Sequence, residues 1–363
     1  MAETGEAFVE FANVQKSYDG ETLVVKDLNL GIERGEFLTM LGPSGSGKTT
    51  CLMMLAGFET ATHGEIRLDG RAINDVAPHK RGIGMVFQNY ALFPHMTVRE
   101  NLAFPLQVRN IDRSTIDQKV RKALDMVKLG DFGNRRPTQL SGGQQQRVAV
   151  ARALVFEPDL VLMDEPLGAL DKNLREQMQY EIKHIHENLG VTVVYVTHDQ
   201  SEALTMSTRI AVFDDGIIQQ LAEPSVLYEK PENAFVAAFI GENNKLTGRV
   251  RSMNGSSCTV ELPDGHEVHA LKVAVDREGD QTTLSLRPER VAVDPEPDRY
   301  PNIFDARVEE LIYLGDHIRT RVSVCGNDEF VVKMPNVGDH ARIQPGSTVK
   351  VGWTMEDCRA LDA

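Results

Sequence analysis

The segment GPSGSGKT, from Gly42 to Thr49, is the feature that most constrains the fold of this chain. It follows the apolar run FLTML and precedes the apolar segment CLMMLAGF. The pattern G-x-x-x-x-G-K-[ST] between a buried strand and a helix predicts a phosphate-binding loop, because its glycines let consecutive backbone N–H groups face an anion at a helix N-terminus. We expect Lys48 to neutralise the β- and γ-phosphates of a nucleotide, and the Thr49 hydroxyl to bind Mg2+. A glycine-rich structural turn is the alternative.

A second segment, LVLMDEP, ends an apolar strand with Asp164 and Glu165. Ligands of an α/β sheet gather at the carboxyl ends of its strands. Asp164 is expected to hold Mg2+, and Glu165 to polarise the attacking water as a general base. An Asp-Glu pair alone is usually a solvated strand end, so this prediction depends on the phosphate-binding loop.

The neighbouring segments alternate between strand and helix patterns. TVRENLAF begins with a capping box from Thr97 to Glu100, and STIDQKVRKALDMVKL predicts a helix capped by Ser114. The short apolar runs DLVLM and VTVVYVT flank the helical segment NLREQMQYEIKHIHENLG, which Gly190 is placed to end. Alternating strands and helices predict a parallel α/β sheet covered on both faces.

The pattern changes from about Glu242, where short alternating runs such as TVELPDGHEVHA are broken by Gly, Pro, Asn and Asp. This texture predicts a small all-β domain. We therefore expect a nucleotide-binding domain over residues 1–240 and a β-rich domain over residues 241–363. The prolines of VDPEPDRYP are expected to mark a connection inside the β-rich part.

The composition limits the partners and the compartment. The chain has 363 residues, and its 39 basic and 53 acidic residues give a net charge of -14, which argues against sequence-independent binding to nucleic acid. The N-terminus lacks the pattern of a secretory signal, and no segment approaches the roughly 20 apolar residues of a membrane span. Its cysteines lie far apart without a C-x-x-C pair, so their spacing indicates neither a zinc site nor a disulfide framework, and a reducing cytoplasm fits best. These are Cys51, Cys258, Cys325 and Cys358.

With the loop and the Asp-Glu pair in place, the chain resembles the ATP-binding subunits of ABC transporters over roughly its first 235 residues. LSGGQQQR, residues 140–147, resembles the signature motif of that family. The other family motifs occur in order: Tyr18 where an aromatic ring stacks on adenine, Gln88 as the Q-loop, Asp171 as the end of the D-loop, and His198 as the switch histidine.

Each of these residues also has an ordinary interpretation. Tyr18 alone reads as a strand aromatic, Gln88 as a polar surface residue, and His198 as a satisfied histidine at a strand end. The resemblance implies instead that Gln88 binds Mg2+ and senses the γ-phosphate, and that the segment after it contacts the transporter. It implies that His198 bonds the γ-phosphate and helps hold the water that Glu165 activates.

In the family, two copies pack head to tail, so that the signature of one closes over the ATP held by the other. The resemblance implies that Ser141 donates a hydrogen bond to the phosphate, that Gly142 and Gly143 permit close approach, and that Gln144 adds a polar contact. The roles of Gln145, Gln146 and Arg147 stay open. The predicted nucleotide-contacting residues are Tyr18, Gly42, Pro43, Ser44, Gly45, Ser46, Gly47, Lys48, Thr49, Thr50, Gln88, Ser141, Gly142, Gly143, Gln144, Asp164 and Asp171, with Thr49, Gln88 and Asp164 also as Mg2+ ligands and Lys48, Gln88, Glu165 and His198 as catalytic residues.

The β-rich part contains LSLRPERV, which resembles a motif of the OB-like, TOBE-type domains of bacterial importer subunits. The resemblance implies a P-loop NTPase domain followed by such a domain, which dimerises or regulates. It implies a homodimer bound to two integral-membrane permeases and served by a periplasmic solute-binding protein, at the cytoplasmic face of the bacterial inner membrane. Arg287, Glu289 and Arg290 are expected to form a structural ion-pair cluster.

Three segments, FIGENNKLTG, LSLRPERV and IYLGDHIRTRV, look most similar to spermidine/putrescine importer ATPases, although ferric-iron, sulfate and sugar importers share the layout. A soluble ABC ATPase would carry a coiled-coil insertion, tandem cassettes or a basic surface, none of which is visible. A P-loop GTPase or small-molecule kinase does not explain LSGGQQQR, and no N-K-x-D motif is present. The intact Lys48, Glu165 and His198 argue against a non-hydrolysing scaffold.

Overall fold

The computed structural model describes residues 7–296, 298–336 and 343–363, which divide into two compact units. The first unit is Met1–Leu227 and the second is Tyr228–Ala363. The division falls within helix α7, whereas the domain boundary expected from the sequence, between residues 240 and 241, stays a prediction. Among the described residues, no helix has both the length and the apolarity needed to cross a bilayer.

The first unit contains two sheets. The six-stranded sheet has the order β10-β9-β3-β8-β7-β6, and all its strands are parallel except the β9–β10 pair. The parallel sheet follows the sequence prediction, but the four-stranded antiparallel sheet β2-β1-β4-β5 was not predicted. The strands are β1 Val9–Ser17, β2 Leu23–Ile32, β3 Phe37–Leu41, β4 His63–Leu68, β5 Arg71–Ala72, β6 Gly84–Val86, β7 Leu160–Asp164, β8 Thr192–Thr197, β9 Arg209–Asp214 and β10 Ile217–Ala222.

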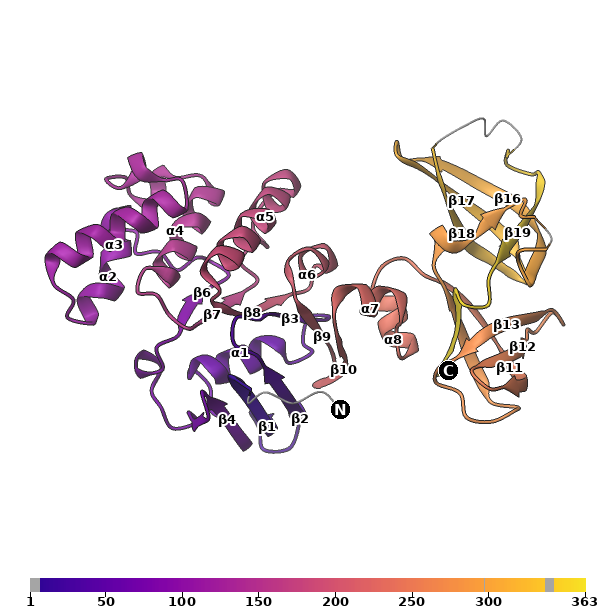
Figure 1. The fold of residues 1–363 in the computed structure, drawn as a ribbon, viewed down its shortest axis with the longest axis horizontal. Coiled ribbons are helices and arrows are strands. Elements are labelled where there is room, and N and C mark those ends of the chain that lie inside the picture. The colour runs from indigo at the N-terminus through magenta and orange to yellow at the C-terminus, as the bar shows by residue number, and fades with distance from the viewer. Residues whose placement is uncertain (1–6, 297, 337–342) are drawn as a thin grey trace. The chain divides into compact units, whose positions relative to one another are not determined.

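Helices cover both faces of the parallel sheet (Figure 1). Helix α1 packs between this sheet and the antiparallel sheet, whereas α4 and α5 pack against the opposite face. Helices α2, α3 and α4 share a further apolar core. The helices are α1 Lys48–Ala56, α2 Val98–Val108, α3 Arg113–Met126, α4 Gly142–Leu154, α5 Lys172–Leu189 and α6 Gln200–Met206, with short 3-10 turns at Pro78–Lys80, Gly130–Phe132 and Pro137–Gln139.

Helix α2 begins as its sequence predicts, whereas helix α3 begins earlier than expected. The capping box of α2 is confirmed, because Thr97 accepts from the Glu100 N–H and the Glu100 carboxylate accepts from the Thr97 N–H. The expected cap of α3 at Ser114 is wrong. Asp112 caps that helix by accepting the Thr115 N–H at 3.0 Å, so Ser114 lies inside the first turn. A carboxylate two residues earlier satisfies the same free N–H groups.

The second unit is β-rich, as its sequence predicts. Strands β11, β12, β13, β20 and β14 close a barrel, and β15-β19-β16-β17-β18 form a five-stranded sheet. The strands are β11 Asn244–Asn254, β12 Ser257–Glu261, β13 Glu267–Lys272, β14 Gln281–Leu286, β15 Ala292–Val293, β16 Asn302–Tyr313, β17 His317–Val324, β18 Asn327–Pro335, β19 Thr348–Trp353 and β20 Cys358–Leu361. Two short helices, α7 Pro224–Glu229 and α8 Ala234–Phe239, and the 3-10 turn Pro288–Arg290 complete the chain.

The LSLRPERV motif has a structural role in this unit. The buried Arg287 guanidinium donates to the carbonyl oxygens of Tyr228, Ala237 and Glu242 at 2.9 to 3.2 Å, and it stacks 4.3 Å from the Tyr228 ring centroid. Arg290 pairs with Glu229 at 2.8 Å. The expected ion-pair cluster of Arg287, Glu289 and Arg290 is therefore wrong: Arg290 pairs with Glu229, and Glu289 accepts a hydrogen bond from the Tyr228 hydroxyl. Arg287 binds backbone carbonyls and anchors the segment that holds α8.

Trp353 is the largest fully buried side chain and packs between Phe304 and Phe330, with ring centroids 5.1 and 5.7 Å away. We expect Trp353→Ala to lower the free energy of unfolding of the β-rich unit by about 3 to 5 kcal/mol, because the lost apolar contacts leave a cavity. Urea unfolding followed by circular dichroism measures this change. Tyr313→Ala, at a position 69% exposed, is the control and should change the value by less than about 0.5 kcal/mol.

Candidate nucleotide site

The phosphate-binding loop connects β3 to α1 and carries the predicted residues Pro43, Ser44, Gly45 and Ser46. The side chain of Lys48 turns back over this loop and is only 5% exposed. Its Nζ donates to the Pro43 carbonyl oxygen at 2.7 Å and to the Ser46 hydroxyl at 3.1 Å. Burial lowers the pKa of Lys48, and nearby carboxylates act in the opposite direction. These two hydrogen bonds hold the Lys48 ammonium against the phosphate-binding loop.

Two glycines of the loop are required by contacts within the chain. A Cβ on Gly42 would overlap the carbonyl oxygen of Phe213, and a Cβ on Gly47 would lie 2.8 Å from the carbonyl oxygen of Val24. Gly47 also has a φ of 97°, which disfavours residues with a side chain. Close packing against neighbouring backbone therefore explains why glycine is needed at these two positions, in addition to any contact with phosphate.

Thr49 and Asp164 lie together although they come from different elements. The Thr49 hydroxyl donates to Asp164 Oδ1 at 3.1 Å, across from the first turn of α1 to the end of β7. Burial raises the pKa of Asp164, and the Thr49 hydrogen bond opposes that shift. Hydroxyl and carboxylate oxygens are the ligands that Mg2+ prefers, so this donor set fits the ion.

Glu165 lies between two of the other predicted residues. Its Oε2 accepts from Gln88 Nε2 at 3.3 Å, and its Oε1 lies 3.2 Å from His198 Nδ1. Its backbone is in the left-handed region, with a φ of 42°. A non-glycine residue in that region carries a cost of about 1 to 3 kcal/mol and is concentrated at functional sites. Gln88 and His198, which are distant in the sequence, thus meet at the Glu165 carboxylate.

Tyr18 lies beside the first turn of α1. The residue is 59% exposed, its hydroxyl is 3.4 Å from the Thr50 hydroxyl, and the ammonium of Lys16 lies 4.6 Å from the ring centroid. Lys16 covers one face of the ring, so a planar base would stack on the other face. Stacking of an aromatic side chain on a base contributes about 1 to 3 kcal/mol.

The signature segment forms the start of α4. Ser141 caps the helix by accepting the Gln144 N–H, and the Gln144 side chain accepts the Ser141 N–H at 3.0 Å. Gln145 donates to the carbonyl oxygens of Pro137 and Leu140 and so holds the preceding turn. In the described part of the chain, the buried amide of Gln146 has no hydrogen-bond partner. Among the described residues, the Ser141 hydroxyl only accepts a hydrogen bond, which leaves its hydrogen for a ligand.

The signature glycines also face the D-loop and α5. A Cβ on Gly143 would lie 2.8 Å from the Leu174 side chain, and one on Gly142 would lie 3.5 Å from Leu170. Asp171 caps α5 by accepting the Leu174 N–H at 3.0 Å. Gly143 therefore allows α4 to approach the start of α5 closely within one chain, whereas a Cβ on Gly142 would make only an ordinary van der Waals contact.

Sequence reasoning missed Arg175 of α5. Its guanidinium donates to the Leu170 carbonyl oxygen at 3.1 Å and to Asp199 Oδ2 at 3.0 Å. Leu170 belongs to the D-loop, and Asp199 follows His198. Arg175 thus ties together the two loops that flank Glu165.

A buried carboxyl group lies behind this arginine. Glu202 of α6 accepts from the hydroxyls of Tyr195 and Thr197, both at 2.7 Å, and lies 3.9 Å from Arg175 Nε. Burial raises the pKa of Glu202. In the sequence, Arg175 and Glu202 look like the charged residues that any surface helix carries on its polar face. The sequence therefore offers no specific signal for this network.

The family model described as ABC transporter matches residues 25–168, and the model described as TOBE domain matches residues 284–361. The spermidine/putrescine import ATP-binding protein PotA of Chromobacterium violaceum is 47% identical over 96% of this chain and 98% of its own length. The protein of the same name from Rubrobacter xylanophilus is 44% identical over 97% of this chain and 93% of its own length.

Solved structures agree with this match. The ATP-binding cassette MJ0796, in a dimeric post-hydrolysis state bound to ADP and Pi, is 38% identical with a TM-score of 0.54 and covers 60% of this chain and 98% of its own. The predicted fold, a P-loop NTPase domain followed by a small all-β domain, is confirmed. The chain belongs to the ABC transporter family of ATP-binding proteins and carries a C-terminal TOBE domain.

Proposed function

We propose that this chain hydrolyses ATP as the energising subunit of an importer for polyamines such as spermidine and putrescine. The observation that carries the ATPase activity is the meeting of Gln88, Glu165 and His198 beside the loop that holds Lys48. The cargo rests on relatives that match nearly the full length of both chains and are named for spermidine/putrescine import.

In this proposal Glu165 accepts a proton from the attacking water while His198 and Gln88 orient that water and the γ-phosphate. The ammonium of Lys48 and the N–H groups of the loop stabilise the charge that develops on the phosphate oxygens. Tyr18 supports the adenine ring. The contacts of Glu165 with Gln88 and His198 support the first of these roles.

Thr49, Asp164 and Gln88 are proposed to hold Mg2+. When bound, the ion would neutralise negative charge on the phosphates. Thr49 and Asp164 are already joined by a hydrogen bond, and Gln88 faces Glu165 through its amide nitrogen, which leaves its amide oxygen for the metal. The domain of residues 1–240 would carry this chemistry, with residues 241–363 as a dimerising or regulatory part.

We also propose a homodimer with two ATP molecules, each held between the loop of one chain and the Ser141–Gln144 turn of the other. The Ser141 hydroxyl donates to the γ-phosphate, and Asp171 lies beside the same interface. Closure on ATP and reopening after hydrolysis would drive two integral-membrane permeases served by a periplasmic solute-binding protein. This places the chain at the cytoplasmic face of the bacterial inner membrane, without nucleic acid as a partner.

Transport by the reassembled complex tests the cargo. The chain is combined in liposomes with two permeases and a binding protein of a polyamine importer, with ATP inside, and uptake of labelled spermidine is compared with uptake of maltose, sulfate and ferric ion. The proposal predicts ATP-dependent uptake of spermidine alone. Uptake of another solute with normal ATP hydrolysis would contradict the cargo and leave the ATPase role intact.

We expect Arg175→Met to lower the turnover number about 10-fold to 100-fold with little change in the KM for ATP. The variant removes charged hydrogen bonds to Leu170 and Asp199, each worth about 1.5 to 3 kcal/mol. Arg175→Lys should recover part of the rate. Steady-state phosphate release measures both constants, and Arg121→Met, at an exposed position of α3, is the control. A change in KM alone would show that Arg175 does not position the loops.

A further inference from the structure

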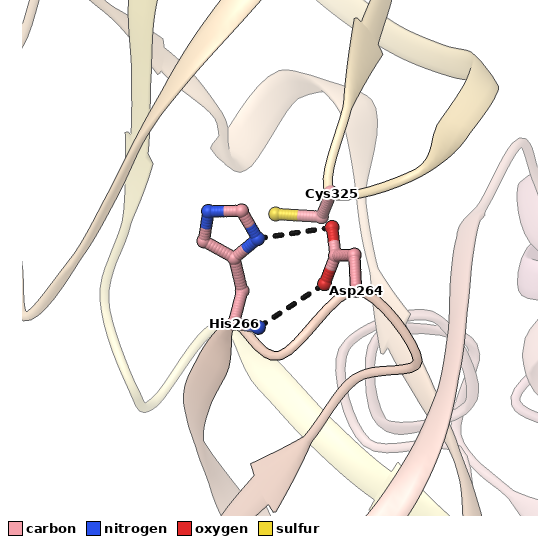
Figure 2. A group of neighbouring side chains, drawn as sticks. All are labelled: Asp264, His266 and Cys325. Carbon is pink, nitrogen blue, oxygen red and sulfur yellow. Dashed lines mark hydrogen bonds and ion pairs between the residues drawn. The ribbon is translucent and has the colours of Figure 1, made fainter.

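Three side chains of the kinds that bind transition metals lie together in the β-rich unit (Figure 2). Asp264 and His266 belong to the turn between β12 and β13, and Cys325 to the turn between β17 and β18. Their ligand atoms all lie within 4.8 Å of one another. No sequence pattern points to this group, because its members come from two hairpins of different sheets.

Two of the three side chains are held in place by further contacts. Asp264 Oδ1 accepts the His266 N–H at 3.1 Å, and Asp264 Oδ2 lies 2.9 Å from His266 Nδ1. The His266 ring packs edge-on against Phe304, with centroids 5.5 Å apart. The carboxylate and the imidazole are therefore oriented by the hairpin and by the apolar core below it.

Cys325 occupies an unusual place for a cysteine. Val324 pairs with Asn327, so Cys325 and Gly326 form a two-residue hairpin loop, and both have positive φ, 52° and 72°. Such loops favour Asn, Asp or Gly at the first position, since a side chain there carries a conformational cost. Turn chemistry therefore does not account for a thiol here, and this thiol faces the Asp264 carboxylate and the His266 ring.

We propose that Asp264, His266 and Cys325 bind a zinc ion, with a fourth position left to water or to a ligand. The mixture of thiolate, imidazole and carboxylate suits Zn2+ rather than Mg2+ or Ca2+, which prefer oxygen ligands alone. Zinc bonds of about 2.0 to 2.3 Å bring ligand atoms about 3 to 4 Å apart, so small side-chain rotations complete the site. On binding, the Cys325 thiol releases its proton to solvent.

Such an ion would join the β12–β13 hairpin of the barrel to the β17–β18 hairpin of the five-stranded sheet. Ions that bind only the folded form raise its stability by mass action. The site lies outside the residues proposed for ATP and does not depend on the proposed function. Its consequence is a metal-responsive link between the two sheets of the β-rich unit.

Metal titration of the full-length chain tests this proposal. After treatment with a chelator and exchange into buffer with excess Mg2+, the protein is titrated with Zn2+ and, separately, with Co2+. We expect one Zn2+ per chain, a higher midpoint of thermal unfolding with Zn2+, and a thiolate-to-Co2+ charge-transfer absorption band. Cys325→Ser should abolish the band, and His266→Ala should weaken Zn2+ binding at least 10-fold. His269→Ala, which removes an exposed histidine of β13, should leave both unchanged.

A second measurement uses the unmodified chain, so the test does not depend on whether the variants fold. Saturating Zn2+ should slow alkylation of Cys325 at least 10-fold, as located by peptide mass mapping, without protecting the other cysteines. Equal alkylation with and without Zn2+ would overturn the site. So would a Co2+ complex that lacks the sulfur band, or Zn2+ binding that persists unchanged in Cys325→Ser.

Discussion

Replacing Glu165 by Gln is expected to lower the ATP turnover number by about 10² to 10⁴ while ATP still binds. The change removes the group proposed to take the proton from water, a role commonly worth that factor. Gln has the same shape, so the neighbours at Gln88 and His198 keep their positions. Phosphate release by the complex with its membrane subunits measures turnover, and fluorescence of a bound nucleotide analogue measures affinity.

Glu176→Gln is the matched control, since it makes the same chemical change at an exposed position of α5. It should leave the turnover number within twofold of the wild-type value. Wild-type turnover in the Glu165 variant would contradict the assignment of this residue as the base.

Lys48→Ala is expected to weaken ATP binding about 10-fold to 100-fold. The variant removes a charged donor to the phosphates, and such hydrogen bonds are worth about 1.5 to 3 kcal/mol. Isothermal titration with ATP and Mg2+ gives the Kd. Because Lys48 also bonds Pro43 and Ser46, circular dichroism must show that the variant keeps its fold.

Lys172→Ala provides the comparison for this variant, because it removes an exposed ammonium at the start of α5. Its Kd for ATP should equal that of the wild type. An unchanged Kd in folded Lys48→Ala would contradict the proposed role of this side chain in phosphate binding.

The parts of the site that could be predicted are those marked by a short motif of neighbouring residues. A glycine-rich turn between strand and helix has few other uses, and an Asp-Glu pair at a strand end becomes informative once that turn is present. Helix starts were less secure, because Asp112 and Ser114 are equally good caps two residues apart and only the first is used. The antiparallel sheet was missed because its strands pair only after the chain has folded back.

What could not be predicted depends on distant segments meeting. Arg175 and Glu202 resemble ordinary charged residues of surface helices until α5 and α6 pack beside the D-loop and the loop of His198. Cys325 has no metal-ligand spacing of its own, since Asp264 and His266 reach it from another sheet. Residues from distant segments were predicted to act together only where a motif marked each of them, as for Thr49 and Asp164.

The three glutamines of the signature illustrate the same limit. Their sequence is uniform, yet Gln144 closes the capping box, Gln145 holds the preceding turn, and Gln146 is buried without a hydrogen-bond partner among the described residues. The helical period gives each a different direction. One motif therefore combines helix capping, loop anchoring and, in the proposal, contact with the nucleotide of a second chain.

The mass of the Glu165→Gln chain in solution, with ATP and Mg2+ or with ADP and Mg2+, tests the composite site most directly. Analytical ultracentrifugation should give the mass of two chains with ATP and of one chain with ADP. Adding Ser141→Arg should prevent the ATP-dependent dimer, because the larger cation fills the space of the facing nucleotide. A mass of one chain with ATP would contradict a site completed by two chains. So would a dimer that forms equally with ATP and ADP and still forms in the Ser141→Arg variant.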